Sequence, residues 1–145
     1  MSEKINGYQN KIADMLKEFP DVGQEETLMR VLLDEMHSSL EFYFKTDGNW
    51  KCEQDLKEAG VIAQNQFRDV RWDFLDILEE MQKQLKNDHQ EVWRMMVFTL
   101  HKNGSYDVEY STDKIDSRVG EMMRWRYKRL GILPGEKNMK YLDEE

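Results

Sequence analysis

The amino-acid sequence predicts an α+β fold: an antiparallel sheet of about four to five strands built from two hairpins, with three helices packed mainly on one face. Two observations support this prediction. Apolar residues recur at three- and four-residue steps in three segments, and strand-like runs joined by tight turns lie between those segments. The 145 residues correspond in length to one domain, so residues 1–145 are interpreted as a single folding unit.

The helical pattern is clearest over residues 65–87. Its apolar positions form one stripe along a helix: Phe67, Val70, Phe74, Leu78, Met81 and Leu85. The same spacing predicts an N-terminal helix over residues 4–18, which Phe19-Pro20 would end. A last helix is expected over residues 115–129, with Gly131 as its C-cap.

The first hairpin is predicted from two runs, residues 26–36 and residues 39–46. The second run alternates, so Leu40, Phe42 and Phe44 would face one side of the sheet and the residues between them the other. Residues 50–65 are ambiguous, although Trp50 to Glu53 could add a short strand.

The second hairpin is predicted from residues 92–101 and 105–111, joined at Asn103-Gly104. Asn-Gly is typical of a two-residue type I′ loop. That loop would place Lys102 opposite Ser105, so Phe98 and Leu100 would oppose Glu109 and Asp107. Both faces of the first strand are apolar, which favours an interior position, whereas the second strand is expected nearer an edge.

Composition excludes several classes of protein. No stretch approaches the ~18 apolar residues of a membrane span, and the N-terminus lacks the basic and then apolar pattern of a secretory signal. The single cysteine, Cys52, excludes an intramolecular disulfide and a cysteine-rich zinc site. These features predict a cytoplasmic protein that does not associate with membranes.

The formal net charge is −8. A net-acidic protein repels phosphate backbones and attracts basic partners, so direct nucleic-acid binding is not expected. The competing interpretation is that the acidity only keeps the protein soluble.

No pattern for catalysis stands out. No local motif links Cys52 to His37, His89 or His101, and the histidines lack metal-ligand spacing. Gly104 and Gly131 are interpreted as a turn and a cap rather than a phosphate loop. The sequence therefore predicts a protein that is not an enzyme, with no catalytic, cofactor-binding or metal-binding residues, and Cys52 as a small core residue.

Four acidic residues share one stripe of the predicted helix over residues 65–87. Asp69, Asp73, Asp76 and Glu80 follow four-, three- and four-residue steps, roughly opposite the apolar stripe. An exposed helix face lacks the converging oxygens that Mg²⁺ or Ca²⁺ requires. Two interpretations stay open: a solvated helix face, or a face that binds a protein.

Trp72 lies beside this stripe, near Glu79, and is a candidate interface anchor. Alternatively, the first or last helix packs against it. A second candidate surface is formed by Asp107 and Glu109 on the predicted edge strand. Such charges also defend edge strands against aggregation, which is the competing interpretation.

The run from Arg124 to Arg129 mixes basic and aromatic residues, a pattern found in nucleic-acid-binding proteins. Basic residues are also favoured in the last turn of a helix, where their stems can cover apolar surface. In a net-acidic chain the second interpretation is preferred.

Four segments carry a resemblance to a known family. They are Leu40-Glu41-Phe42-Tyr43-Phe44, the acidic helix from Phe74 to Met81, Gln90-Glu91-Val92-Trp93 with the hairpin Asn103-Gly104-Ser105-Tyr106, and the closing segment Trp125-Arg126-Tyr127-Lys128-Arg129-Leu130-Gly131-Ile132-Leu133-Pro134. These segments resemble the YezG family of bacterial immunity proteins, and the closing segment is the most specific of them.

The resemblance implies a small cytoplasmic antitoxin, produced with a polymorphic toxin of the LXG type, that neutralises the toxin's C-terminal nuclease domain. No catalytic residue or cofactor comes with the family. The expected partner is thus a basic nuclease domain, contacted first through Asp69, Trp72, Asp73, Asp76, Glu79 and Glu80, and second through Asp107 and Glu109.

Two rival functions are considered. One is a regulatory adaptor that binds an endogenous basic protein and shares every surface feature above. The other is a metal- or cysteine-dependent enzyme acting on a small molecule, for which Cys52 would be the nucleophile.

Overall fold

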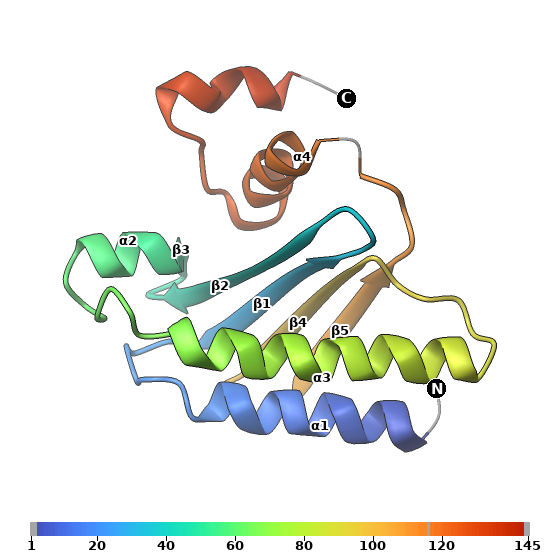
Figure 1. Ribbon diagram of the computed structural model, residues 1–145. Helices are drawn as coiled ribbons and strands as arrows, with labels where there is room; N and C mark the ends of the chain where they lie inside the picture. The colour runs from blue at the N-terminus through green and yellow to red at the C-terminus, as the bar shows by residue number, and fades with distance from the viewer. Residues whose placement is uncertain (1–2, 116, 144–145) are drawn as a thin grey trace.

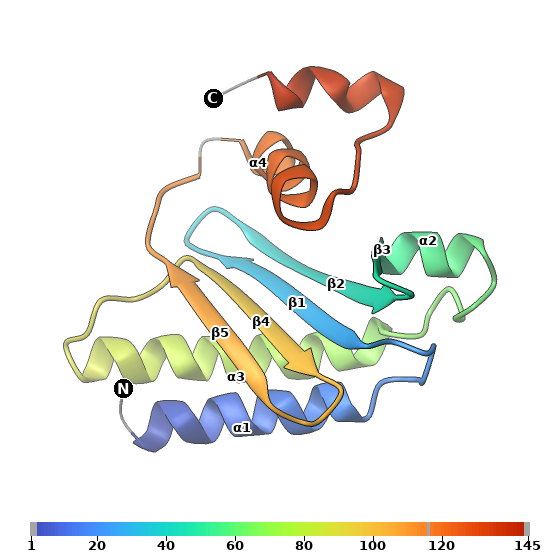
Figure 2. The ribbon, with the colours of Figure 1, turned by 180° about the vertical axis from the view of Figure 1, so that it is seen from behind.

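A computed structural model describes residues 3–115 and 117–143 of the chain. Its centre is one five-stranded antiparallel sheet with the strand order β3-β2-β1-β4-β5 (Figures 1 and 2). The strands are β1 (Glu26–Leu33), β2 (Ser38–Thr46), β3 (Asn49–Cys52), β4 (Met95–His101) and β5 (Tyr106–Ser111). Strands that follow one another along the chain through tight turns pair antiparallel, as the sequence predicts. The α+β fold class is confirmed.

Helices cover the two faces of the sheet unequally. The long helices α1 (Glu3–Lys17) and α3 (Arg68–Asn87) lie side by side on one face (Figure 1). The opposite face carries the C-terminal segment, which consists of α4 (Arg118–Trp125), the π-helical turn η1 (Arg126–Leu130) and the 3-10 helix η2 (Glu136–Leu142) (Figure 2). A short helix, α2 (Glu53–Glu58), follows β3 at the edge of the sheet.

The main core lies between the sheet and the α1/α3 layer. Alternate residues of β1 and β2, such as Met29 and Phe42, point into it and meet the apolar stripe of α3. Phe19, after α1, stacks on Phe67 at 4.6 Å between ring centroids and meets Phe42 edge-on at 4.9 Å. Burying one such ring contributes roughly 1.5–3 kcal/mol, so this aromatic cluster is a major source of stability.

A smaller core lies on the other face of the sheet. It contains Leu28, Tyr43, Val97 and Leu130, with Trp125 packed against it. Leu130 closes the π-helical turn, and Gly131 then adopts a left-handed φ of 72°, confirming the predicted C-cap. The expected helix over residues 115–129 thus divides into α4 and η1, and residue 116 lies outside the described residues.

The predicted register of the second hairpin is wrong by one residue. Phe98 pairs with Val108 and Leu100 with Tyr106, so Glu109 and Asp107 do not oppose these two residues. The loop has three residues rather than two: the His101 N–H donates to the Ser105 carbonyl at 2.8 Å. The Asn103 side chain accepts from the Ser105 N–H at 3.0 Å, and Gly104 takes a φ of 92°. An asparagine side chain that bonds two residues ahead, followed by a left-handed glycine, favours this longer loop.

Candidate interaction surface

One side of α3 carries five exposed carboxylates: Asp69, Asp73, Asp76, Glu79 and Glu80. We call this surface the α3 acidic face. At about 100° per residue it points away from the buried residues Phe74, Leu78 and Met81, which face the sheet. Within residues 3–115 and 117–143, none of the five carboxylates forms a hydrogen bond or an ion pair through its side chain. Because no cation of the described residues pairs with these carboxylates, the face presents a negative field to solvent.

Trp72 rises from the same face with 67% of its surface exposed. Neither α1 nor the C-terminal segment packs on it, so the alternative that another helix buries this side chain is wrong. An exposed tryptophan is an uncommon surface residue, and its rigid ring loses little entropy when it becomes buried in an interface. The structure therefore brings the six residues predicted on this helix together on one open surface.

Asp107 and Glu109 lie elsewhere. Their strand, β5, turns Tyr106 and Tyr110 toward the main core and these two carboxylates toward the opposite face. Asp107 accepts from His101 at 2.7 Å, and Glu109 pairs with Arg129, with one nitrogen–oxygen distance of 3.1 Å. The two predicted acidic surfaces thus lie on different faces of the sheet, and both carboxylates of the second are already paired within the chain.

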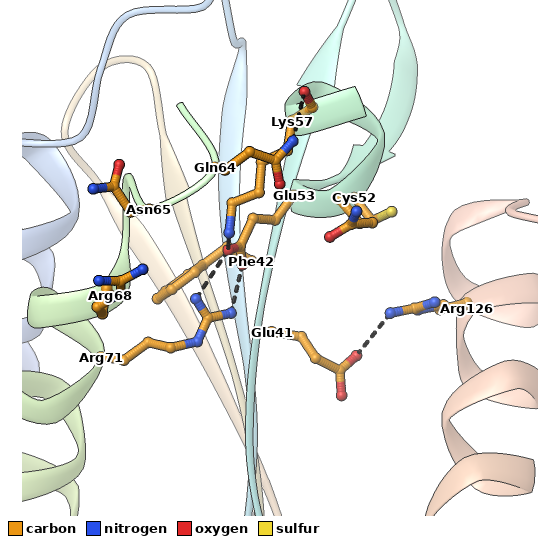
Figure 3. A pocket seen from close by; sticks show the side chains of 11 residues that line it. Glu41, Phe42, Cys52, Glu53, Lys57, Gln64, Asn65, Arg68, Arg71 and Arg126 are labelled. Atoms are coloured by element: carbon orange, nitrogen blue, oxygen red, sulfur yellow. Dashed lines mark hydrogen bonds and ion pairs between the residues drawn. The ribbon is translucent and has the colours of Figure 1, made fainter. Parts of the chain in front are cut away.

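The structure adds a pocket that the sequence did not reveal, which we call the α2–α3 pocket (Figure 3). It lies where α2, the start of α3, β2, the end of β3 and η1 meet, and its volume is about 460 Å³. Four cations and two carboxylates contribute to its lining: Lys57, Arg68, Arg71, Arg126, Glu41 and Glu53. The pocket is therefore a net positive site in a protein of net charge −8.

The two carboxylates of this pocket are neutralised from within. Arg71 donates to Glu53 at 2.9 Å and to the Leu40 carbonyl at 3.1 Å, and Lys57 reaches Glu53 at 2.6 Å. Burial alone would raise the pKa of Glu53, but the hydrogen bonds from Arg71 and Lys57 outweigh it and lower that pKa. The guanidinium of Arg68 is exposed at the mouth and has no partner in the described part of the chain.

Sequence reasoning missed this pocket because its residues come from five separate elements and the loop before α3, and the sequence pattern of residues 50–65 is ambiguous. The available signal was the spacing of Arg68 and Arg71, which places both cations at the start of the predicted helix. Basic residues are unfavourable near a helix N-terminus, so two of them there indicate that another group compensates.

A second unpredicted feature is a buried ionic network beneath the C-terminal segment. The Arg30 side chain, on the central strand β1, is 1% exposed, pairs with Glu41 at 3.0 Å and with Glu121, and lies over the Trp125 ring at 5.0 Å. The buried Tyr43 hydroxyl donates to Glu41 and accepts from Arg126 Nε at 2.6 Å. Burial raises the pKa of Tyr43, as do its contacts with Glu41, so this hydroxyl stays protonated and serves as a donor.

Contacts within the chain explain the basic residues between Arg124 and Arg129. Arg126 contacts Tyr43, Arg124 donates to the Tyr141 carbonyl at 3.0 Å, and Arg129 pairs with Glu109. Arg126 and Arg129 hold the C-terminal segment onto the sheet, and Arg124 ties α4 to η2 within that segment. These contacts agree with the structural interpretation of the run rather than with nucleic-acid binding.

Cys52 lies at the end of β3, where its thiol donates to Asp55 at 3.0 Å. Burial and this hydrogen bond raise the pKa of Cys52, whereas a cysteine nucleophile requires a lowered pKa. His37 pairs with Asp34, and His101 pairs with Glu26 and Asp107, so neither histidine approaches Cys52. No cluster of three or more metal-ligand side chains occurs among the described residues.

The helices of the described residues include none that is both long enough and apolar enough to cross a bilayer.

Comparisons with known proteins agree with this architecture. The family model described as immunity protein YezG-like matches residues 5–143.

Two curated relatives are each named immunity protein YezG. The relative from Bacillus subtilis (strain 168) is 28% identical over 105 residues, which cover 68% of this chain and 70% of the relative. The relative from Bacillus spizizenii (strain W23) is 23% identical over 144 residues, which cover 94% of this chain and 89% of the relative. Because the family model spans nearly the whole described fold, the chain belongs to the YezG-like family of immunity proteins.

Proposed function

We propose that this chain is an antitoxin that binds and neutralises a cognate bacterial toxin, that the toxic domain is a basic nuclease, and that binding takes place in the cytoplasm. Membership of an immunity-protein family supports the presence of a toxin partner. The observation that carries the finer proposal is the α3 acidic face, five exposed and unpaired carboxylates around an exposed tryptophan.

The mechanism follows from charge complementarity. A nuclease needs a positive surface to hold a phosphate backbone, so an acidic inhibitor can occupy the same field. Complementary charges accelerate association, while a buried aromatic anchor slows dissociation. On this account inhibition requires binding alone, with no chemistry performed by the antitoxin.

Asp107 and Glu109 are the second candidate contact. Asp107 is paired with His101 and Glu109 with Arg129, so a partner would have to displace one of these side chains before using them. Exposed ion pairs are individually weak, and such an exchange is feasible. The α3 acidic face is favoured because it requires no exchange.

The first test reverses charge on the α3 acidic face. In the double variant Asp73→Lys/Asp76→Lys we expect association with the toxin's C-terminal domain to slow by about tenfold to a hundredfold at low salt. The salt dependence of the association rate should also flatten, because less charge remains to be screened. Stopped-flow mixing over a range of NaCl concentrations measures both quantities.

The matched control is Asp113→Lys/Glu136→Lys. It makes the same change in net charge at two exposed carboxylates outside α3. If both double variants slow association equally, only net charge matters. If neither does, the α3 acidic face is not the contact surface.

The second test removes the proposed anchor. Because Trp72 is 67% exposed, Trp72→Ala should change the free energy of unfolding by less than about 0.5 kcal/mol. A hot-spot residue should nevertheless cost about 2 kcal/mol or more in binding, chiefly through faster dissociation from the toxin. Surface plasmon resonance gives the dissociation rate, and an unchanged rate would remove Trp72 from the interface.

The nature of the partner separates this proposal from an adaptor function. The toxin domain encoded beside this chain should arrest growth when expressed alone, and co-expression of this chain should restore growth. A purified complex that leaves nuclease activity intact, or a chain that binds only an endogenous basic protein, would favour the adaptor.

A further inference from the structure

We propose that the α2–α3 pocket receives a carboxylate of the toxin, a contact that rests on the proposed function and gives the complex its orientation. The pocket opens beside the α3 acidic face, since Arg68 precedes Asp69 and lies one turn, about 6 Å along the helix axis, before Trp72. A partner seated on Trp72 therefore also covers the mouth of the pocket.

The arrangement of charge in the α2–α3 pocket favours the binding of an anion. The two carboxylates are deep, with 12% and 10% side-chain exposure for Glu41 and Glu53, and both are engaged by cations of the chain. The exposed guanidinium of Arg68 at the mouth is not engaged by any residue that the structure describes. Arg68 projects from the first turn of α3 (Figure 3). A planar guanidinium with free donors matches a carboxylate through two parallel hydrogen bonds.

A protein carboxylate fits this site better than a nucleic-acid phosphate. The five unpaired carboxylates of the α3 acidic face begin at the residue after Arg68, and they would repel the next phosphates of any polyanion. A basic protein surface that carries an isolated acidic side chain satisfies both features at once. Its cations meet the α3 acidic face and its carboxylate meets Arg68.

The α3 acidic face and the α2–α3 pocket should affect different steps of binding. Several like charges on an open ridge act at long range and set the rate of association. A single charge-assisted hydrogen bond at the mouth of a pocket acts only after contact, and it should set the rate of dissociation and the register of the complex.

The test is Arg68→Glu, measured with the purified toxin domain encoded beside this chain. We expect Kd to rise about tenfold to a hundredfold through faster dissociation, although the added negative charge beside the α3 acidic face should speed association and steepen its salt dependence. The matched control is Arg118→Glu, which makes the same charge change at the exposed first residue of another helix, α4, on the opposite face of the sheet. Both substitutions place an acid in a first helical turn, so both should leave the fold intact.

Two further readouts identify the contact. Toxin binding should slow alkylation of Cys52 by iodoacetamide at pH 8.5, because this cysteine lines the same pocket. In addition, one single Asp→Lys or Glu→Lys variant of the toxin domain should bind Arg68→Glu more tightly than it binds the unaltered chain.

The outcomes distinguish the two proposals. If Asp73→Lys/Asp76→Lys weakens binding while Arg68→Glu binds normally, or if toxin binding leaves the alkylation rate of Cys52 unchanged, the pocket proposal is overturned and the proposed function stands. If sodium acetate protects Cys52 as well as the toxin does, while Arg68→Glu binds the toxin normally, the pocket is a small-anion site. If the unaltered chain does not bind the toxin domain, both proposals fail.

Discussion

The two faces of the sheet are held by different kinds of interaction. On the α1/α3 face, β1 contributes Met29 and Val31 to a continuous apolar core. On the other face the same strand contributes Arg30, which is as deeply buried as its apolar neighbours. The small core there contains Leu28, Tyr43, Val97 and Leu130 among the described residues, and ionic and hydrogen-bonded contacts also hold the C-terminal segment.

This difference has a physical consequence. Apolar burial is non-directional, so it holds α1 and α3 firmly but tolerates small shifts. A buried charge network is directional, and each member that loses its partner carries a large desolvation cost. The network therefore fixes the position of the C-terminal segment, and it is also the place where one substitution should cause the greatest loss.

The largest expected effect comes from Arg30→Met. The substitution leaves Glu41 and Glu121 without this cation beneath α4, and breaking a buried ionic cluster in this way costs about 3–5 kcal/mol. Urea denaturation measures the loss in the free energy of unfolding. Amide hydrogen exchange should show the largest loss of protection in α4 and η1 rather than in α3.

Two variants make this result interpretable. The triple variant Arg30→Met/Glu41→Gln/Glu121→Gln also removes the two carboxylate charges that lost Arg30, and it should recover part of the stability. Arg94→Met removes a partly exposed arginine that donates to the Thr112 carbonyl, and it should cost only about 1 kcal/mol. If Arg30→Met costs no more than Arg94→Met, the ionic network does not hold the C-terminal segment.

Sequence reasoning correctly predicted the orientation of side chains where the pattern within a single helix or strand decides it. The apolar stripe of α3 specifies by itself which side is buried, so the carboxylates and Trp72 on the opposite side are exposed as that stripe requires. The strand β2 likewise follows from strict alternation. In α3 the local period records burial directly, whereas in β2 it records only which face each residue takes, since Tyr43 on the other face is buried as well.

It failed where the outcome depends on contacts between distant residues. Nothing local to Arg30 indicates that Glu121, far along the chain, will pair with it. The register of the second hairpin depends on the hydrogen bond that the Asn103 side chain accepts from Ser105 and on the left-handed Gly104, and apolar periodicity records neither. The α2–α3 pocket likewise exists only after five elements have come together.

A smaller effect tests whether stability depends on pH near neutrality through the sheet face that carries Arg30 and the C-terminal segment. His101 lies between Asp107, at 2.7 Å from Nε2, and Glu26, at 2.8 Å from Nδ1. The hydrogen bond with Asp107 raises the pKa of His101, against a small opposing effect of burial, and Glu26 adds to the rise. Because the folded pKa lies above the unfolded value of about 6.5, the protonated histidine stabilises the fold fully below that pH.

This stabilisation should then be lost as the pH rises through the folded pKa of His101. The urea midpoint should fall by a small amount above about pH 6.5, since this side chain is partly exposed and its ion pairs are screened. His101→Gln should remove that decline, whereas His89→Asn should keep it, because His89 is exposed and asparagine tolerates its left-handed φ of 55°. If the decline persists in His101→Gln, another group causes the pH response. His101 would then not make its face of the sheet sensitive to pH.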